Sequence, residues 1–404
     1  MGGGEIMKNY KTILIPVKCS KEELHILFQY NRLSAQVWNL CLELDKKYKE
    51  ENKKHISNND LQKQTKKCIE LPAKCIHHVV HKYLFARDSM FKSIKAKHKN
   101  SNKVKLPYRT KKYFTTGWDY QSIKTDYNKG LIQLVRPKIK TENGIKRQES
   151  IKCYSKNLPQ NIKEVELIWR NKLYLAIKYL DNTEYQQIQS NNTSAIDLGE
   201  IHAITSIDNN GNAIIITGRK LRSIKYLRNK NQARIYEKMS KCTKGSKQYK
   251  KYIRSLEKLR IKTENHIKDG VHKVSKHYLD YCLNNNINTV YYGDLDSCTR
   301  NTRKKHVTNT NVRQKLSQWN YGLLMQILEN KLKQYGIKLI KVKEYYTSKT
   351  CPECGCLNKP KKRNYKCDCG YTQHRDIVGS INILNTNSSY RIKKYNNKKY
   401  LQIA

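Results

Sequence analysis

The sequence predicts a multidomain α+β protein, with a β-barrel-like first half that carries a helical insert and a mixed α/β second half that carries an inserted cysteine ribbon. Three observations lead to this fold class. Short β-rich runs enclose a helical stretch in the first half, the second half alternates hairpin, helices, strand, helix and strand, and five of the 13 cysteines fall within residues 351–369. At 404 residues the chain is long enough to form several hydrophobic cores.

The first predicted region spans residues 8–180. Apolar side chains recur at helical spacing over two segments, 21–48 and about 60–99, so we place a helical insert at about 21–105. The runs before this insert and after residue 110 have the apolar, β-rich composition of short strands. We expect them to form a β barrel interrupted by the helices.

A polar linker at 181–194 precedes the second half, which begins with a region at 195–346. Two apolar strands joined through Asn-Asn-Gly at 209–211 predict a hairpin, and two long basic helices follow over 219–285. The remaining predicted parts are a ribbon at 347–372, a last segment of the second half at 373–386 and a basic tail at 387–404.

The net charge predicts a nucleic-acid partner. Lys and Arg number 81 against 33 Asp and Glu, a formal charge of +48, and a surplus of this size repels itself unless a polyanion neutralises it. This balance excludes an ordinary enzyme of small metabolites, so we expect no small-molecule substrate. The basic side chains expected to contact nucleic acid are Arg219, Lys220, Arg222, Lys361, Lys362, Arg363 and Arg375.

The sequence gives no sign of a membrane partner. It contains no run of about 18 apolar residues, and no secretion signal precedes Lys8. Thirteen cysteines in such a chain indicate a reducing compartment. We therefore expect a cytoplasmic bacterial protein that associates with the nucleoid when it binds DNA.

Four cysteines have the spacing of a zinc site. Cys351-Pro-Glu-Cys354 is followed, after twelve residues, by Cys367-Asp-Cys369. Two such knuckles present four thiolates, as tetrahedral Zn²⁺ requires, and four protein ligands make a closed, structural site. Cys356 is a spare thiol that could exchange with one of them.

Two aspartates mark a second metal site. Asp197 lies mid-strand in Ala-Ile-Asp-Leu-Gly, and Asp376 lies in His-Arg-Asp, seven residues after the last cysteine of the ribbon. Phosphodiester hydrolysis with two Mg²⁺ ions needs carboxylates on neighbouring elements, so we predict that both bind Mg²⁺. His202 and His374 could also touch metal or phosphate, although packed or solvated histidines are more common.

Together these motifs resemble the TnpB family. The resemblance covers about residues 194–385 and includes Asp197 in Ile-Asp-Leu-Gly, Gly-Asp-Leu at 293–295, Tyr-Thr-Ser-Lys-Thr-Cys at 346–351, the ribbon and His-Arg-Asp. TnpB proteins are RNA-guided nucleases of small transposons, related to miniature type V CRISPR effectors. The resemblance implies an RNase H-like (RuvC) nuclease domain with an inserted zinc ribbon, and an N-terminal wedge with a helical recognition insert. It also implies a guide RNA from the element, a double-stranded DNA target and a short flanking DNA motif.

The third acid departs from the family pattern. The family usually has a Glu directly before Asp-Leu, and this chain has Gly293 there. Glu344 could replace it, because it ends the neighbouring strand. Asp294 or Asp296 could also replace it, although one residue along a strand points to the opposite face. The site could instead be incomplete, but the retention of Asp197 and Asp376 argues against decay.

Two other functions fit parts of the sequence. The first is a nuclease-inactive, RNA-guided DNA-binding regulator of the same family. The second is a DDE-type transposase that acts without RNA and also uses three carboxylates. A terminal ribbon followed by His-Arg-Asp fits the transposase poorly.

Overall fold

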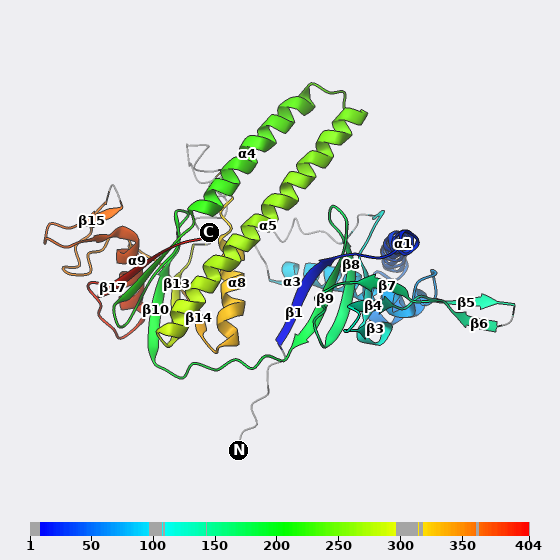
Figure 1. Cartoon of the computed structure of the whole chain (residues 1–404), viewed down its shortest axis with the longest axis horizontal. Helices are drawn as coiled ribbons and strands as arrows, with labels where there is room; N and C mark the ends of the chain where they lie inside the picture. The colour runs from blue at the N-terminus through cyan, green and yellow to red at the C-terminus, as the bar shows by residue number, and fades with distance from the viewer. Residues whose placement is uncertain are drawn as a thin grey trace, which may run out of the picture. The chain divides into compact units, whose positions relative to one another are not determined.

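The computed structural model describes residues 9–96, 107, 110–142, 144–295, 314, 318–360 and 363–403. The chain forms two compact units, Met1–Thr183 and Glu184–Ala404, each with both helices and strands (Figure 1). The boundary between the units falls inside the predicted linker at 181–194. The predicted multidomain α+β class is therefore confirmed.

The described strands of the N-terminal unit form separate antiparallel sheets. One has the order β1-β9-β8-β2, a second has the order β3-β4-β7, and β5 pairs with β6. The closed barrel expected from the sequence stays a prediction, since these sheets share no hydrogen-bonded strand. The strands are β1 (Asn9–Pro16), β2 (Thr116–Asp119), β3 (Ile123–Asp126), β4 (Leu131–Leu134), β5 (Lys138–Thr141), β6 (Gly144–Arg147), β7 (Ile151–Tyr154), β8 (Ile162–Trp169) and β9 (Leu173–Asp181).

The described part of the helical insert contains three helices. The long α1 (Lys21–Asn52) begins at a capping box, in which Glu23 N donates to Ser20 Oγ at 3.1 Å and Ser20 N donates to Glu23 Oε2 at 3.0 Å. The single helix expected over about 60–99 is instead divided into α2 (Asn58–Gln64) and α3 (Ala73–Lys95). The division has a local cause, because Pro72, which has no N–H, immediately precedes α3.

A buried ion pair joins these helices. Asp45 of α1 accepts hydrogen bonds from Tyr83 Oη at 2.7 Å and from Arg87 Nη1 at 3.2 Å, both on α3. Arg87 Nη1 also donates to Ile56 O at 2.9 Å, so the guanidinium holds the turn before α2 as well. The side chains of Asp45 and Arg87 are only 4% and 6% exposed. If one of them were removed, water could not replace it as the partner of the other charge.

The second unit is built on a six-stranded mixed sheet with the order β14-β13-β10-β11-β12-β17. Strands β10, β13 and β14 are parallel to one another, β11 is antiparallel to β10 and β12, and β17 is parallel to β12. The bounds are β10 (Asn192–Asp197), β11 (His202–Asp208), β12 (Asn212–Thr217), β13 (Ile287–Gly293), β14 (Lys338–Val342) and β17 (Asn397–Gln402).

The predicted hairpin at 209–211 is confirmed, since it joins β11 to β12. Gly211 has a φ of 81°, and its N–H donates to Asp208 O at 3.1 Å. The chain also reverses earlier, between β10 and β11, where a Cβ on Gly199 would lie 2.8 Å from His202 O. The mid-strand position predicted for Asp197 is therefore wrong, because this tight reversal makes Asp197 the last residue of β10.

Helices cover both faces of the sheet. On one face, Ile196 packs in a core with residues of α5 (Lys247–Asn284) and α8 (Tyr321–Gln334). On the other face, Ala195 packs in a core with α9 (Arg375–Asn387). The two predicted basic helices are confirmed as α4 (Arg219–Ser240) and α5, which lie side by side and antiparallel (Figure 1).

The segment predicted as a basic tail is partly structured. Its residues 397–402 form β17, which pairs with β12 over the full length of both strands. The sequence of β17, Asn-Lys-Lys-Tyr-Leu-Gln, has no alternation of polar and apolar residues that would predict a strand. No helix in the described part of the chain is both apolar enough and long enough to cross a bilayer.

We predict that Asp45→Ala lowers the free energy of unfolding by about 3–5 kcal/mol, because Arg87 would stay buried without its partner. The measurement is urea-induced unfolding followed by tryptophan fluorescence, since three of the four tryptophans lie in the N-terminal unit, which also contains Asp45. Lys46→Ala is the matched control. It removes an exposed pair with Glu50 on the same helix and should cost less than about 0.5 kcal/mol. Equal losses in the two variants would contradict the prediction.

Candidate active site and metal centre

Asp197 lies at the end of β10 on the face covered by α9. Side chains alternate along a strand, so Asp197 shares the face of Ala195, which packs against α9. Helix α9 approaches closely there because it carries Gly379, where a Cβ would lie 2.7 Å from Asp197 Oδ2. A larger residue at this position would push against the carboxylate.

Asp376 comes from the first turn of α9 and is buried. This helix follows β16 (Thr372–His374) of the ribbon directly, with His374 as its N-cap residue. The connection between the ribbon and α9 therefore places Asp376 beside the sheet. A carboxylate in the first turn also complements the positive end of the helix dipole.

Glu344 follows β14 and fills the space left by Gly293. The two strands pair with Gly293 opposite Val342, so Glu344 continues the same face two residues later. A Cβ on residue 293 would overlap Glu344 Oε2, so the carboxylate occupies the place of a residue-293 side chain. Thr347 Oγ1 donates to Glu344 Oε1 at 3.1 Å and fixes it there.

The alternative third acids are placed differently. Asp294 is exposed and pairs with Lys341 at 2.8 Å, on the opposite face of the strand from Gly293. Asp296 lies outside the described residues. Of the two, the structure gives only Asp294 a position, and that position points away from Asp197.

Burial and nearby charges shift the pKa values of the three carboxyl groups. Burial raises the pKa of Asp197 well above its usual range, and the charges of Glu344 and Asp376 raise it further. Burial also raises the pKa of Glu344. Burial acts in the same sense on Asp376, but a hydrogen bond from His202 and the charge of Arg363 outweigh it and lower the pKa of that carboxyl.

Two histidines and an arginine surround Asp376. His202 is buried, and its Nδ1–H donates to Asp376 Oδ2 at 2.8 Å. Arg363 of the ribbon forms an ion pair with the same oxygen. His374 Nδ1 is buried without a hydrogen-bond partner among the described residues, and burial lowers the pKa of this imidazole. No spacing in the sequence distinguishes these histidines from packed ones.

The residues fit a divalent cation. Oxygen ligands are those that Mg²⁺ prefers, and a bound cation would offset the burial and the neighbouring negative charges that raise the pKa of Asp197. The guanidinium of Arg363 already places one positive charge on Asp376. His202, His374 and Asp376 also offer one ligand atom each within 4.8 Å of one another.

The four predicted zinc ligands converge. The ligand atoms of Cys351, Cys354, Cys367 and Cys369 lie within 4.8 Å of one another, with Sγ–Sγ distances of 3.7 Å for the pair 351–369 and 3.5 Å for 354–367. Sulfurs at about 2.3 Å from one Zn²⁺ in a tetrahedron are about 3.8 Å apart. The cluster therefore has the dimensions of a closed zinc site.

Local backbone geometry builds the two knuckles. Gly355 N donates to Cys351 O and Gly370 N donates to Cys367 O, both at 3.0 Å, and both glycines have positive φ. Backbone hydrogen bonding at Cys356 lowers the pKa of Cys354 to about 6, which favours the thiolate that binds metal. Cys356 itself is exposed and lies outside the four-cysteine cluster.

The predicted nucleic-acid contacts lie in two places. Arg219, Lys220 and Arg222 begin α4, near the turn that follows Asp197, because Gly218 N donates to Ile201 O at 2.7 Å. Arg375 and Arg363 lie beside Asp376, with Arg375 Nε 3.7 Å from its Oδ1. Lys361 and Lys362 fall outside the described residues.

Comparisons with known families match the second unit. Residues 176–299 match the OrfB_IS605 family, described as a probable transposase, and residues 321–383 match the Cas12f1-like TNB domain. The second match contains the ribbon cysteines, Glu344 and Asp376. The first contains Asp197.

Curated relatives match between 38% and 53% of the chain. A TnpB-like protein of Methanocaldococcus jannaschii is 31% identical over 191 residues, which is 46% of this chain and 66% of the relative. A CRISPR-associated endodeoxyribonuclease Cas12f1 of an uncultured archaeon is 30% identical over 38% of this chain and 30% of the relative. A Cas12f1 of Sulfoacidibacillus thermotolerans is 27% identical over 53% of this chain and 50% of the relative. The chain thus matches between 30% and 66% of the length of these relatives.

Solved structures share the fold over most of the chain. A Cas12f1–sgRNA–target DNA complex aligns with 90% of this chain and 83% of its own, with a TM-score of 0.66 and 17% identity. The mini-RNA-guided endonuclease CRISPR-Cas phi3 aligns with 93% of this chain and 92% of its own, with a TM-score of 0.55 and 10% identity. The resemblance predicted from the motifs is confirmed, and the chain is a relative of the TnpB-like and Cas12f1 proteins.

Proposed function

We propose that this chain is an RNA-guided DNA endonuclease that cleaves double-stranded DNA by Mg²⁺-dependent phosphodiester hydrolysis. Its RuvC-like site would consist of Asp197, Glu344 and Asp376. One observation carries the proposal: carboxylates from β10, the end of β14 and α9 lie on one face at one end of a single sheet, with Glu344 in the space over Gly293. Such a set matches what metal-assisted hydrolysis needs.

The partners follow from the charge and from the relatives. A chain of +48 requires a polyanion, and solved relatives with this fold include a complex with sgRNA and target DNA. A guide RNA would read most of the target by base pairing, while the protein reads duplex shape and a short flanking motif. The N-terminal unit would supply the wedge and recognition functions.

The residues of the site would divide into metal ligands, a residue that orients one ligand, and residues that attract the substrate. Bound Mg²⁺ would activate water and stabilise the leaving oxygen. Asp197, Glu344 and Asp376 would hold the metal, and His202 would orient Asp376 through its hydrogen bond at 2.8 Å. Arg375 and Arg363 would attract the phosphodiester, since both guanidinium groups lie beside Asp376.

We predict that Asp197→Asn and Asp376→Asn each reduce cleavage about a hundredfold or more, because each removes a metal ligand. Guided DNA binding should persist. Asp197→Asn should also leave the melting temperature unchanged or higher, since it removes a buried charge from a repulsive group. The assay uses the protein with its copurifying RNA, Mg²⁺ and a target that matches that RNA.

Asp294→Asn is the matched control, because it makes the same change on the opposite face of the sheet. Undiminished cleavage by either site variant would refute the site. Wild-type protein that binds its target and never cuts would indicate the nuclease-inactive regulator. Target recognition without any RNA would indicate the transposase.

Glu344→Gln should abolish cleavage to the same extent, because Gly293 supplies no ligand. Gly293→Ala should also impair cleavage, since its Cβ would displace the Glu344 carboxylate. The double variant Gly293→Glu with Glu344→Gly returns an acid to the same place and should recover part of the rate. If Glu344→Gln cuts normally while Asp294→Asn does not, the assignment of the third acid is wrong.

We propose a structural Zn²⁺ at the cysteine cluster, and elemental analysis of purified protein should find about one zinc per chain. Replacing Cys351 and Cys367 together by Ser should remove it. Cys356→Ser should retain it, because this thiol lies outside the cluster. Equal zinc in all three proteins would contradict the ligand set.

A further inference from the structure

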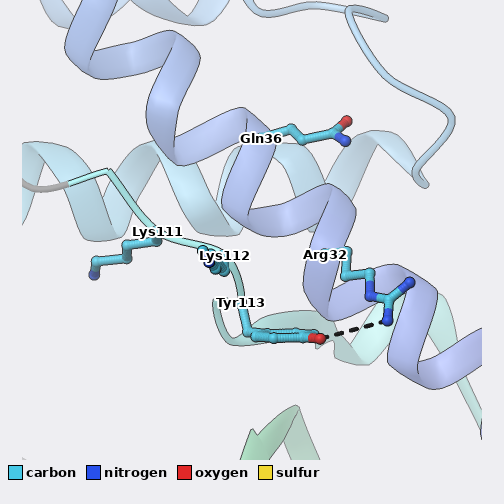
Figure 2. Close-up of a pocket in the computed structure, with 5 residues that line it drawn as sticks. All are labelled: Arg32, Gln36, Lys111, Lys112 and Tyr113. Atoms are coloured by element: carbon cyan, nitrogen blue, oxygen red, sulfur yellow. Dashed lines mark hydrogen bonds between the residues drawn. The ribbon is translucent and has the colours of Figure 1, made fainter. Parts of the chain in front are cut away.

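A pocket of about 370 Å³ lies in the N-terminal unit, and its lining residues include none of those discussed above as nucleic-acid contacts. It is lined by Arg32, Gln36, Lys111, Lys112 and Tyr113 (Figure 2). Arg32 and Gln36 are four residues apart on the exposed side of α1, and the other three come from the segment that leads into β2. None of these five lining residues is acidic.

The segment that forms one wall is fixed to α1. Lys111 N donates to Asn39 Oδ1 at 2.8 Å, and Asn39 Nδ2 donates to Lys111 O at 3.0 Å. Phe114 N donates to Asn31 O at 2.8 Å, three residues further along. The backbone of the pocket is thus ordered before any partner arrives, which lowers the entropic cost of binding.

The cations of the pocket have different tasks. Lys111 Nζ lies 3.6 Å from the ring centre of Trp38, and burial lowers the pKa of this ammonium. It therefore anchors the wall. Arg32 and Lys112 are exposed and remain available for an anion.

The aromatic residue is held in place and still open to solvent. Arg32 Nη2 donates to Tyr113 Oη at 3.4 Å, the contact drawn in Figure 2. Tyr113 is nevertheless 52% exposed. An exposed ring beside two exposed cations provides both a stacking surface and a counter-charge.

We propose that this pocket binds one nucleotide within a nucleic-acid strand. Arg32 and Lys112 would bind the phosphate, the base would stack on Tyr113, and the Gln36 amide would hydrogen-bond to the base edge. This proposal rests on the proposed function for its partner and adds a site to it. A free inorganic anion or an acidic peptide without aromatic groups would use the cations and would not stack on the Tyr113 ring, which also has the Arg32 guanidinium 5.6 Å from its centre.

The test measures binding of the full chain to fluorescently labelled single-stranded RNA and to double-stranded DNA of the same sequence, over a salt series. The double variant Arg32→Gln with Lys112→Gln should lower affinity about tenfold and flatten the slope of log affinity against log salt by about 0.7 for a single strand, because one phosphate contact is lost. The control Lys47→Gln with Lys49→Gln makes the same charge change elsewhere on α1. It should lower affinity less than about twofold.

Substitutions of Tyr113 separate stacking from charge. Tyr113→Ala should lower affinity about tenfold without changing the salt slope, and Tyr113→Phe should retain wild-type affinity. A loss confined to RNA assigns the pocket to an RNA strand, and a loss confined to DNA assigns it to the target. If the pocket variants lower affinity no more than the Lys47→Gln with Lys49→Gln control does, the pocket is not a binding site, and the proposed function is unaffected. Wild-type protein that binds neither probe overturns the proposed function as well.

Discussion

Burial of carboxylates at one end of the sheet is the constraint on which the site of the second unit depends. Loss of water and neighbouring negative charge both disfavour an ionised carboxylate. The fold accepts this cost at Asp197, whose pKa rises, and offsets it at Asp376 through His202 and Arg363. Glycines at 293 and 379 then let the acidic groups approach.

The ribbon and the helix that carries Asp376 form one packed body. Val378 of α9 shares a small core with Cys351, Tyr365, Cys367 and Tyr371 of the ribbon. Asn382 Nδ2, one turn further on, donates to Thr347 O at 2.6 Å and to Thr350 O at 2.8 Å. A structural metal in the ribbon would therefore steady the helix that bears the acid, as well as the loop that follows Glu344.

Much of this arrangement could be predicted from the sequence, because spacing is visible there. The C-x2-C and C-x-C spacing predicted the cysteine cluster, and the Asn-Asn-Gly turn predicted the hairpin. What depends on contacts between distant segments could not be predicted. Only coordinates reveal that His202 reaches Asp376, that β17 completes the sheet, or that α1 and the segment before β2 enclose a pocket. The early end of β10 was missed because apolar residues continue through the turn.

Strand β17 has a consequence for solubility. It pairs with the edge of β12. Without it, the backbone N–H and C=O groups of Ile214, Ile215 and Ile216 would be free to pair with a strand of another molecule. The new border carries Lys398 and Lys399, both exposed, and like charges discourage two such borders from joining. Positive charge on β17 therefore disfavours pairing of two copies through this edge of the sheet.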